Sequence, residues 1–335
     1  MGAQREKRMT ITRTKGGANL ATRVVAALVG ALAHAGFQAK ASADQTVLKI
    51  ASQKGGTKSL MIASGALAGA PYRVEWSEFP SAQALLEALS AGAVDAGAVG
   101  DAPFVFAYAA GSKIKVVEAT RASGGGASTA VLVRANAPIR TPADLKGRRI
   151  ATGRGSIGHY LLLRVLEKAG LTPKDVTVVF LNPGDAKAAF SSGSVDAWAT
   201  WGSYVGLAQL HDHARLLADG RGLLSGIGFE AAFDGSIDAK HRQLEDFLRR
   251  LARAQRWEAA HKAEYAAVLA KETGLPADVA LYTVSQARGV PSPIDAAIVG
   301  EERETLNRYA AAAVVGAAPN IDGAFDRSFN GAVAP

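Results

Sequence analysis

Three glycine-containing turns carry the residue types that could bind an anion. They lie at residues 55–57, 100–103 and 155–156, each after a β-compatible run and before a helical one. Glycine lets the backbone approach a ligand closely, and the hydroxyls of Thr57 and Ser156 add hydrogen-bond donors. Free N–H groups and aligned peptide dipoles at a helix start favour negative charge by about 0.3–1 kcal/mol, or about 2 when partly buried. Such turns can hold a small tetrahedral anion without any chemical reaction.

The chain lacks the residues that most other chemistry requires. It has no cysteine, which excludes disulfides, thiolate metal sites and a cysteine nucleophile. The segment 53–59 lacks the spacing of a P-loop, and the segment after Gly153 lacks the dinucleotide-binding pattern. His211 and His213 have no third ligand near them for a metal ion. We therefore predict no metal, no cofactor and no catalytic residue.

Two of the four tryptophans, Trp198 and Trp201, lie three residues apart at the end of an expected strand. Their rings could pack against an apolar part of a ligand, and Tyr204 could add a hydroxyl. Packing in the hydrophobic core is the alternative for both tryptophans.

An internal repeat with an offset of about one hundred residues organises the chain. Residues 50–56 (IASQKGG) resemble residues 150–156 (IATGRGS), and residues 92–96 (GAVDA) resemble residues 193–197 (GSVDA). The two matches keep their order and nearly their spacing. We therefore predict two similar α/β lobes, with the glycine-containing turns at the carboxyl ends of strands, where open α/β sheets bind ligands.

Short β-compatible runs alternate with helical patterns, which favours largely parallel sheets covered by helices. Two further extended runs, 129–134 and 229–233, are predicted to be hinge strands that cross between the lobes. One long helix is expected over residues 239–272. The other expected strands cover residues 47–51, 94–99, 115–118, 149–152, 176–180 and 195–199, and the expected helices include 57–67, 157–169 and 185–192.

Positive charge is concentrated at the beginning of the chain. The formal net charge is +8, and residues 1–43 hold seven basic residues and one acid, which leaves only +2 for the remainder. An apolar run over 24–33, too short to span a bilayer, precedes the small residues Ala41-Ser42-Ala43. We predict a cleaved secretory signal over 1–43 and a mature protein in the periplasm; a disordered basic arm is the alternative. The low charge of the remainder argues against a nucleic-acid partner.

These motifs resemble those of the periplasmic binding proteins that deliver aliphatic sulfonates, taurine or nitrate to ATP-driven importers. The resemblance covers nearly all of the chain after residue 43. Its most specific pieces are Gln53-Lys54-Gly55-Gly56, Glu78-Phe79-Pro80, Gly100-Asp101-Ala102-Pro103, Asp144-Leu145-Lys146-Gly147, Gly155-Ser156 with His159, and Gly193-Ser194-Val195-Asp196-Ala197-Trp198.

The resemblance implies an α/β fold of the two-lobed periplasmic binding protein type II. Each lobe is then a mostly parallel sheet flanked by helices, and two hinge strands join the lobes. We expect lobe 1 to comprise residues 44–132 and 229–335, and lobe 2 residues 133–228. The resemblance also implies capture of a small organosulfur anion, delivery to an ABC transporter permease in the inner membrane, and no enzymatic step. We expect the protein to be a monomer.

Three positions depart from the pattern of sulfonate-binding members of the family. Phe104 stands where a second proline is usual, Ile157 replaces a second serine, and Gly202-Ser203 replaces Asp-Pro after Trp201. Loss of a carboxylate and a hydroxyl suggests a longer or more apolar organosulfur ligand. The ligand-binding residues that the resemblance implies are Gln53, Gly55, Thr57, Gly100, Asp101, Ala102, Gly155, Ser156, His159, Trp198 and Trp201.

Two other functions can be weighed against solute binding. A desulfinase-like or other enzyme is the main alternative, because desulfinases and pyrimidine-precursor synthases resemble these binding proteins. The known desulfinase chemistry uses a cysteine, and here only His159 and Arg154 could serve as an acid and an electrostatic clamp. A ligand-sensing domain of a transcription regulator is disfavoured, because the start of the chain leaves no room for a DNA-reading helix pair.

Overall fold

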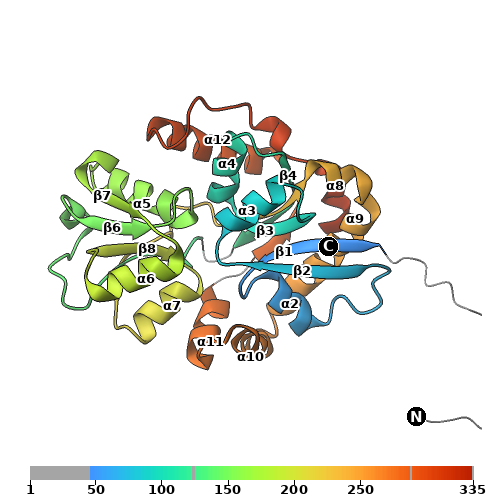
Figure 1. Ribbon diagram of the computed structural model, residues 1–335, viewed down its shortest axis with the longest axis horizontal. Helices are drawn as coiled ribbons and strands as arrows, with labels where there is room; N and C mark the ends of the chain where they lie inside the picture. The colour runs from blue at the N-terminus through green and yellow to red at the C-terminus, as the bar shows by residue number, and fades with distance from the viewer. Residues whose placement is uncertain (1–45, 123–124, 287–288, 334–335) are drawn as a thin grey trace, which may run out of the picture. The chain divides into compact units, whose positions relative to one another are not determined.

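The computed structural model describes residues 46–122, 125–286 and 289–333. They form two β-sheets, which Figure 1 shows with the helices that cover them. The first sheet has the strand order β11-β4-β10-β3-β1-β2 and the second β7-β6-β8-β5-β9. The first sheet is built from β1 (Val47–Gln53), β2 (Arg73–Phe79), β3 (Ala96–Gly100), β4 (Ile114–Ala122), β10 (Ile227–Phe233) and β11 (Gly289–Ser292). The second is built from β5 (Thr129–Val133), β6 (Arg149–Thr152), β7 (Thr177–Phe180), β8 (Ala197–Trp201) and β9 (Arg215–Asp219).

Helices cover both faces of the first sheet because its strands bury alternate side chains on opposite faces. Ala51 joins the core under α3 (Ala82–Ser90) and α4 (Asp101–Ala109). Its neighbour Ile50 joins the core under α2 (Thr57–Ser64) and α9 (His241–Glu258). Strands β1, β2, β3 and β4 point one way, and β10 and β11 run against them. The helices of this part are α2 (Thr57–Ser64), α3 (Ala82–Ser90), α4 (Asp101–Ala109), α8 (Asp234–Ala239), α9 (His241–Glu258), α10 (Lys262–Thr273), α11 (Ala277–Gln286), α12 (Ala296–Ala311) and α13 (Asn330–Val333).

The second sheet uses only residues 129–219. Helix α5 (Ile157–Lys168) covers one face, and α6 (Pro183–Ser192) and α7 (Ser203–Leu210) cover the other. The chain enters this sheet between β4 and β5 and leaves it between β9 and β10. Both strands expected at the crossings are fully paired, β5 between β8 and β9, and β10 between β3 and β4.

The structure confirms the internal repeat at the level of single hydrogen bonds. The backbone N–H of Lys49 donates to Asp95 Oδ2 at 2.7 Å, and that of Arg149 donates to Asp196 Oδ2 at 2.9 Å. The register agrees as well, since Ile50 pairs with Ala96 in the first sheet and Ile150 with Ala197 in the second. In each sheet, an aspartate just before one strand (β3 or β8) thus accepts a hydrogen bond from the neighbouring strand (β1 or β6) and holds the two strands together.

The expectation of one helix over 239–272 is wrong, because the segment forms two helices, α9 and α10. The break follows from His261, whose Nδ1 lies 2.8 Å from the carbonyl oxygen of Trp257 and whose ring stacks on the Trp257 ring. The backbone N–H of His261 bonds instead to Glu258 O at 3.2 Å, in a tighter turn. Helix α10 can then pack against α2 and α11.

The predicted signal segment 1–43 lies outside the described residues. Among the residues that are described, no helix combines the length and the apolar character needed to cross a bilayer.

Two buried glutamates face each other in the middle of the first sheet. Glu118 on β4 pairs with Glu230 on β10, and their exposed fractions are 1% and 3%. Burial raises the pKa of Glu118 to about 8, an effect that Gln255 and the charge of Arg256 only partly offset. Burial and the charge of Glu118 raise the pKa of Glu230 well above its ordinary range. Both side chains therefore hold their protons at neutral pH.

Candidate functional site

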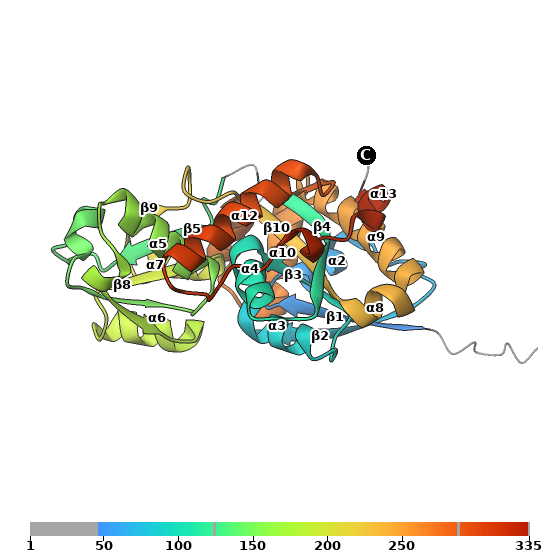
Figure 2. The same cartoon turned by 90° about the horizontal axis from the view of Figure 1, so that it is seen from above.

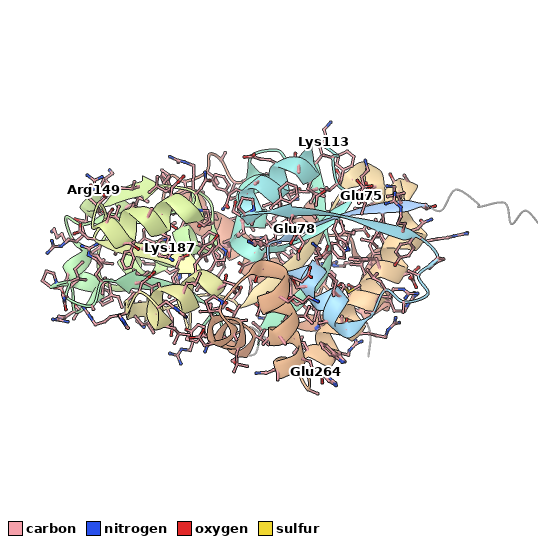
Figure 3. All side chains as sticks on the ribbon, turned by 60° about the horizontal axis from the view of Figure 1, so that its bottom comes forward. Glu75, Glu78, Lys113, Arg149, Lys187 and Glu264 are labelled. Carbon is pink, nitrogen blue, oxygen red and sulfur yellow. The ribbon has the colours of Figure 1, made fainter. Side chains whose placement is uncertain are left out.

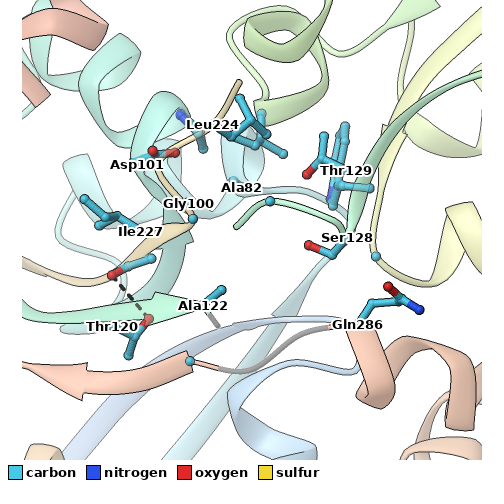
Figure 4. A pocket seen from close by; sticks show the side chains of 18 of the residues that line it. Ala82, Gly100, Asp101, Thr120, Ala122, Ser128, Thr129, Leu224, Ile227 and Gln286 are labelled. Atoms are coloured by element: carbon cyan, nitrogen blue, oxygen red, sulfur yellow. Dashed lines mark hydrogen bonds between the residues drawn. The ribbon is translucent and has the colours of Figure 1, made fainter. Parts of the chain in front are cut away.

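A cavity of about 290 Å³, here called the central cavity, lies where the carboxyl ends of strands from both sheets meet (Figure 4). Gln53 ends β1, Gly100 ends β3 and Trp201 ends β8, and all three line the cavity. The first sheet also contributes Asp101, the first residue of α4, and the second sheet contributes Ser156 before α5. Helix starts from both sheets thus meet at one place, as expected for a ligand site in open α/β sheets.

The wall of the central cavity is largely apolar, and nearly all of its polar side chains are neutral. Hydroxyls come from Thr120, Ser128 and Thr129, and carboxamides from Gln53 and Gln286. Lysine, arginine and histidine are absent from the lining that the structure describes. The cavity can therefore bind an anion only through hydrogen-bond donors and helix dipoles, without a cationic partner in its wall.

Asp101 is the single acid of the described lining, and both of its oxygens are engaged. Its carboxylate accepts hydrogen bonds from the backbone N–H of Ala102 at 2.6 Å and from the hydroxyl of Ser225. Burial raises the pKa of Asp101 to about 6, despite these bonds. Because Ser225 belongs to the segment that returns from the second sheet, Asp101 connects the start of α4 to that crossing.

Ser156 shapes the start of α5. Its hydroxyl accepts a hydrogen bond from the backbone N–H of His159 at 3.1 Å and donates to Gly153 O at 2.7 Å. It therefore acts as an N-cap that satisfies one free N–H group of the helix.

Five of the eleven residues expected at the site line the central cavity, namely Gln53, Gly100, Asp101, Ser156 and Trp201. The other six do not line it: Gly55, Thr57, Ala102, Gly155, His159 and Trp198.

Most of the six residues outside the lining pack behind the cavity wall and support it. A Cβ atom on Gly155 would collide with the ring of Phe106, and the φ of Gly155 is +67°, so only glycine fits there without strain. His159 is buried, and its Nδ1 accepts a hydrogen bond from the Gly155 N–H at 3.2 Å. Burial, assisted by the charge of Arg154, lowers the pKa of His159 to about 4, so the imidazole is neutral. Trp198 packs in the core beside Phe190, its exposed fraction being 1%.

The three departures from the family pattern have different positions. Ile157 and Gly202 line the central cavity, whereas Phe104 is fully buried in the core of the first sheet. Gly202 has a φ of +58°, a conformation that a residue with a side chain adopts only with strain. Ser203 begins α7.

Several lining residues were missed by the sequence reasoning. Ser128 and Thr129 lie at the first crossing, which was recognised as a hinge but not as part of the site. A hinge beside a cleft could have indicated them. Thr283 and Gln286 come from the end of α11, and no motif marks that segment.

Two helices from the last third of the chain contact the helices of the second sheet. Arg308 of α12 bonds Glu167 near the end of α5 at 3.1 Å. Asp278 of α11 lies 3.1 Å from His211, which follows α7, and Tyr282 donates to Gln209 at 2.7 Å. Figure 1 shows α12 and α11 at opposite sides, and Figure 2 shows α12 alongside α4.

Comparison with known proteins identifies the family. Residues 74–219 match the family described as NMT1/THI5 like. The chain is 34% identical to the aliphatic sulfonates-binding protein of Escherichia coli (strain K12) over 287 residues, which cover 84% of this chain and 89% of that protein. The chain belongs to the family of the aliphatic sulfonate-binding proteins. The taurine-binding periplasmic protein of Escherichia coli (strain K12) is 34% identical over 53% of the chain and 54% of its own length.

Solved structures agree with this membership. The alkanesulfonate-binding protein of Xanthomonas axonopodis pv. citri, solved bound to MOPS, has a TM-score of 0.80 and 33% identity, and the match covers 84% of this chain and 99% of that one. The two-lobed α/β binding-protein fold is thereby confirmed. A desulfurization enzyme with 18% identity and a TM-score of 0.63 shares the fold alone, covering 86% of this chain and 98% of its own. The relatives above 30% identity are binding proteins, which favours binding over the enzyme alternative.

Proposed function

We propose that this protein is the extracytoplasmic solute-binding component of an ABC importer. It captures an organosulfur anion, an aliphatic sulfonate or a related compound, in the central cavity and delivers it to a permease in the inner membrane. The observation that carries the proposal is a cavity walled by strand-end turns of both sheets, in a chain that is 34% identical to a sulfonates-binding protein over 84% of its length.

The proposed binding mode follows from the neutral lining of the cavity. The sulfonate accepts hydrogen bonds from backbone N–H groups at the starts of α4 and α5 and from hydroxyls such as that of Thr129. A micromolar Kd corresponds to about 8 kcal/mol, and hydrogen bonds to a charged group contribute about 1.5–3 kcal/mol each. Four such bonds, with burial of the organic part against Trp201 and Leu224, are therefore sufficient.

The proposed transport cycle uses the two lobes as a clamp. Lobe 1 holds the first sheet and lobe 2 the second, so β5 (Thr129–Val133) belongs to lobe 2 and β10 (Ile227–Phe233) to lobe 1, and the expected boundaries at 132/133 and 228/229 shift by a few residues. The lobes close over the ligand about the crossing segments. The permease then recognises the closed form of the monomeric protein. Residues 1–43 act as the export signal and place the mature chain in the periplasm.

Titration of the purified protein with ethanesulfonate tests this function. We expect micromolar binding by calorimetry and a change in tryptophan emission, because Trp201 lines the cavity. Trp201→Phe should lose most of the emission change. Trp76→Phe is the matched control, because Trp76 packs against Phe247 of α9 and does not line the central cavity. Absence of heat and of any melting-temperature shift with ethanesulfonate, taurine and nitrate would disprove the proposal.

A further inference from the structure

A second and larger cavity lies beside the central cavity. This side cavity has a volume of about 780 Å³ and is enclosed by α3 and α4 of the first sheet and by the ends of β6 and β7 of the second. Pro103 lines both cavities. The turn after β6 also borders both, because Ser156 faces the central cavity while Gly153 and Arg154 face the side cavity. The two cavities are therefore adjacent, with Pro103 and the turn after β6 between them.

Phe106 and Gly155 also lie in contact between the two cavities. Phe106 lines the side cavity, and its ring lies directly against the Cα of Gly155. The central cavity, at about 290 Å³, is at the lower limit for an organic ligand. A sulfonate with a short substituent fits within it, whereas a larger substituent needs further space, and the side cavity is the space next to it.

The walls of the side cavity suit a flat apolar group. Leu86 and Phe106 come from the first sheet's helices, and Phe180 and Leu181 from the end of β7. Glu87 and Asp185 also line this cavity and would repel a second anionic group. With Arg154 as the one cation of the described lining, the formal charge of the wall is −1, which favours an uncharged part of the ligand over a second anionic group.

Arg154 and Phe180 form a stacked pair in the wall of the side cavity. The Arg154 guanidinium lies over the ring of Phe180, with Cζ 4.0 Å from the ring centroid. Arg154 forms neither an ion pair nor a hydrogen bond with other residues of the described chain. A planar cation stacked on one ring by one face can receive a second ring on the other.

We infer that the side cavity is an aryl subsite, which holds the aromatic ring of an arylalkanesulfonate while the central cavity holds its sulfonate. This inference rests on the proposed function, because it requires the sulfonate to bind in the central cavity. It adds a substrate class and assigns the selection of that class to Arg154 and Phe180.

The test compares three probes by calorimetry on the whole protein: ethanesulfonate, 2-phenylethanesulfonate and octanesulfonate. We expect 2-phenylethanesulfonate to bind at least about tenfold more tightly than ethanesulfonate, because its ring is buried. Arg154→Met keeps an apolar stem but removes the cation. It should weaken binding of 2-phenylethanesulfonate about three- to tenfold and leave the other two probes within about twofold. Phe180→Leu should act in the same direction.

Arg149→Met is the matched control, because Arg149 lies at the opposite end of β6 and its side chain is exposed (Figure 3). It should change the binding of no probe. Equal losses for all three probes in Arg154→Met would assign Arg154 to the sulfonate and overturn the aryl subsite. An equal loss for octanesulfonate and 2-phenylethanesulfonate would overturn its aromatic selectivity. Binding of ethanesulfonate with no gain from the phenyl group would refute the inference alone, whereas no binding of any probe would refute the proposed function as well.

Discussion

The buried Glu118 should make this protein less stable as the pH rises from 5 to 8. The folded protein keeps a proton on Glu118 up to a pKa of about 8, whereas the unfolded chain releases it near the ordinary value of 4.5. A group whose pKa is raised on folding stabilises fully at low pH, and its contribution is lost as the pH rises through the folded value. Each unit of pH in this interval costs about 1.4 kcal/mol, so the loss between pH 5 and pH 8 is about 4 kcal/mol.

Glu118→Gln should remove this dependence, because the amide has no proton to lose. We expect the free energy of unfolding of the variant, relative to the natural protein, to rise by about 2–4 kcal/mol from pH 5 to pH 8. Urea unfolding at four pH values, followed by far-UV circular dichroism, measures it. Glu75→Gln is the control, since Glu75 is exposed on β2 (Figure 3). A difference between Glu118→Gln and the natural protein that is the same at pH 5 and pH 8 would refute the reasoning.

Two further predictions concern Asp101, in the wall of the central cavity, and Gly155, which lies behind that wall. Asp101→Asn should bind ethanesulfonate about tenfold more tightly at pH 7.5, because an ionised carboxyl in the wall repels the anion. The natural protein should gain affinity as the pH falls through about 6, where Asp101 takes up its proton, and calorimetry should find this gain absent from the variant. Gly155→Ala should lower the free energy of unfolding by about 1–3 kcal/mol, because the φ of Gly155 is positive and the new methyl group would collide with Phe106. Urea unfolding measures this loss. Gly147 is the control, because its φ is also positive but the space around it is open, so an equal loss in Gly147→Ala would contradict the steric part of the argument.

The pattern of alternating strands and helices was sufficient to predict the core of both sheets. The internal repeat predicted two similar sheets correctly because it reflects a repeated physical requirement. Asp95 and Asp196 each accept a hydrogen bond from the backbone of the neighbouring strand. The break at His261 could not be foreseen, because it depends on one imidazole competing for a backbone carbonyl inside a helical pattern. Strand β11 has four residues, and its pairing with β4 depends on contacts far away in sequence.

The site was predictable where it is made of strand ends. Gln53, Gly100 and Ser156 follow from the rule that ligands lie at the carboxyl ends of parallel strands. Trp198 and Trp201 were indistinguishable in sequence, yet one is core and the other lines the cavity, because successive side chains of a strand alternate between its faces and Trp201 ends the strand. Thr283 and Gln286 reach the cavity only because α11 packs against α7.

The position of β10 between β3 and β4 sets the order in which a newly made chain can finish its parts. The second sheet is available once residue 219 has been synthesised, since all five of its strands come from one continuous stretch. The first sheet lacks its central strand β10 until residues 227–233 have been synthesised, and it lacks its edge strand β11 until residues 289–292 have been synthesised. Two wall residues of the central cavity, Thr283 and Gln286, come later still than β10. A nascent chain therefore has no complete binding site for its ligand until nearly all of the chain has been synthesised.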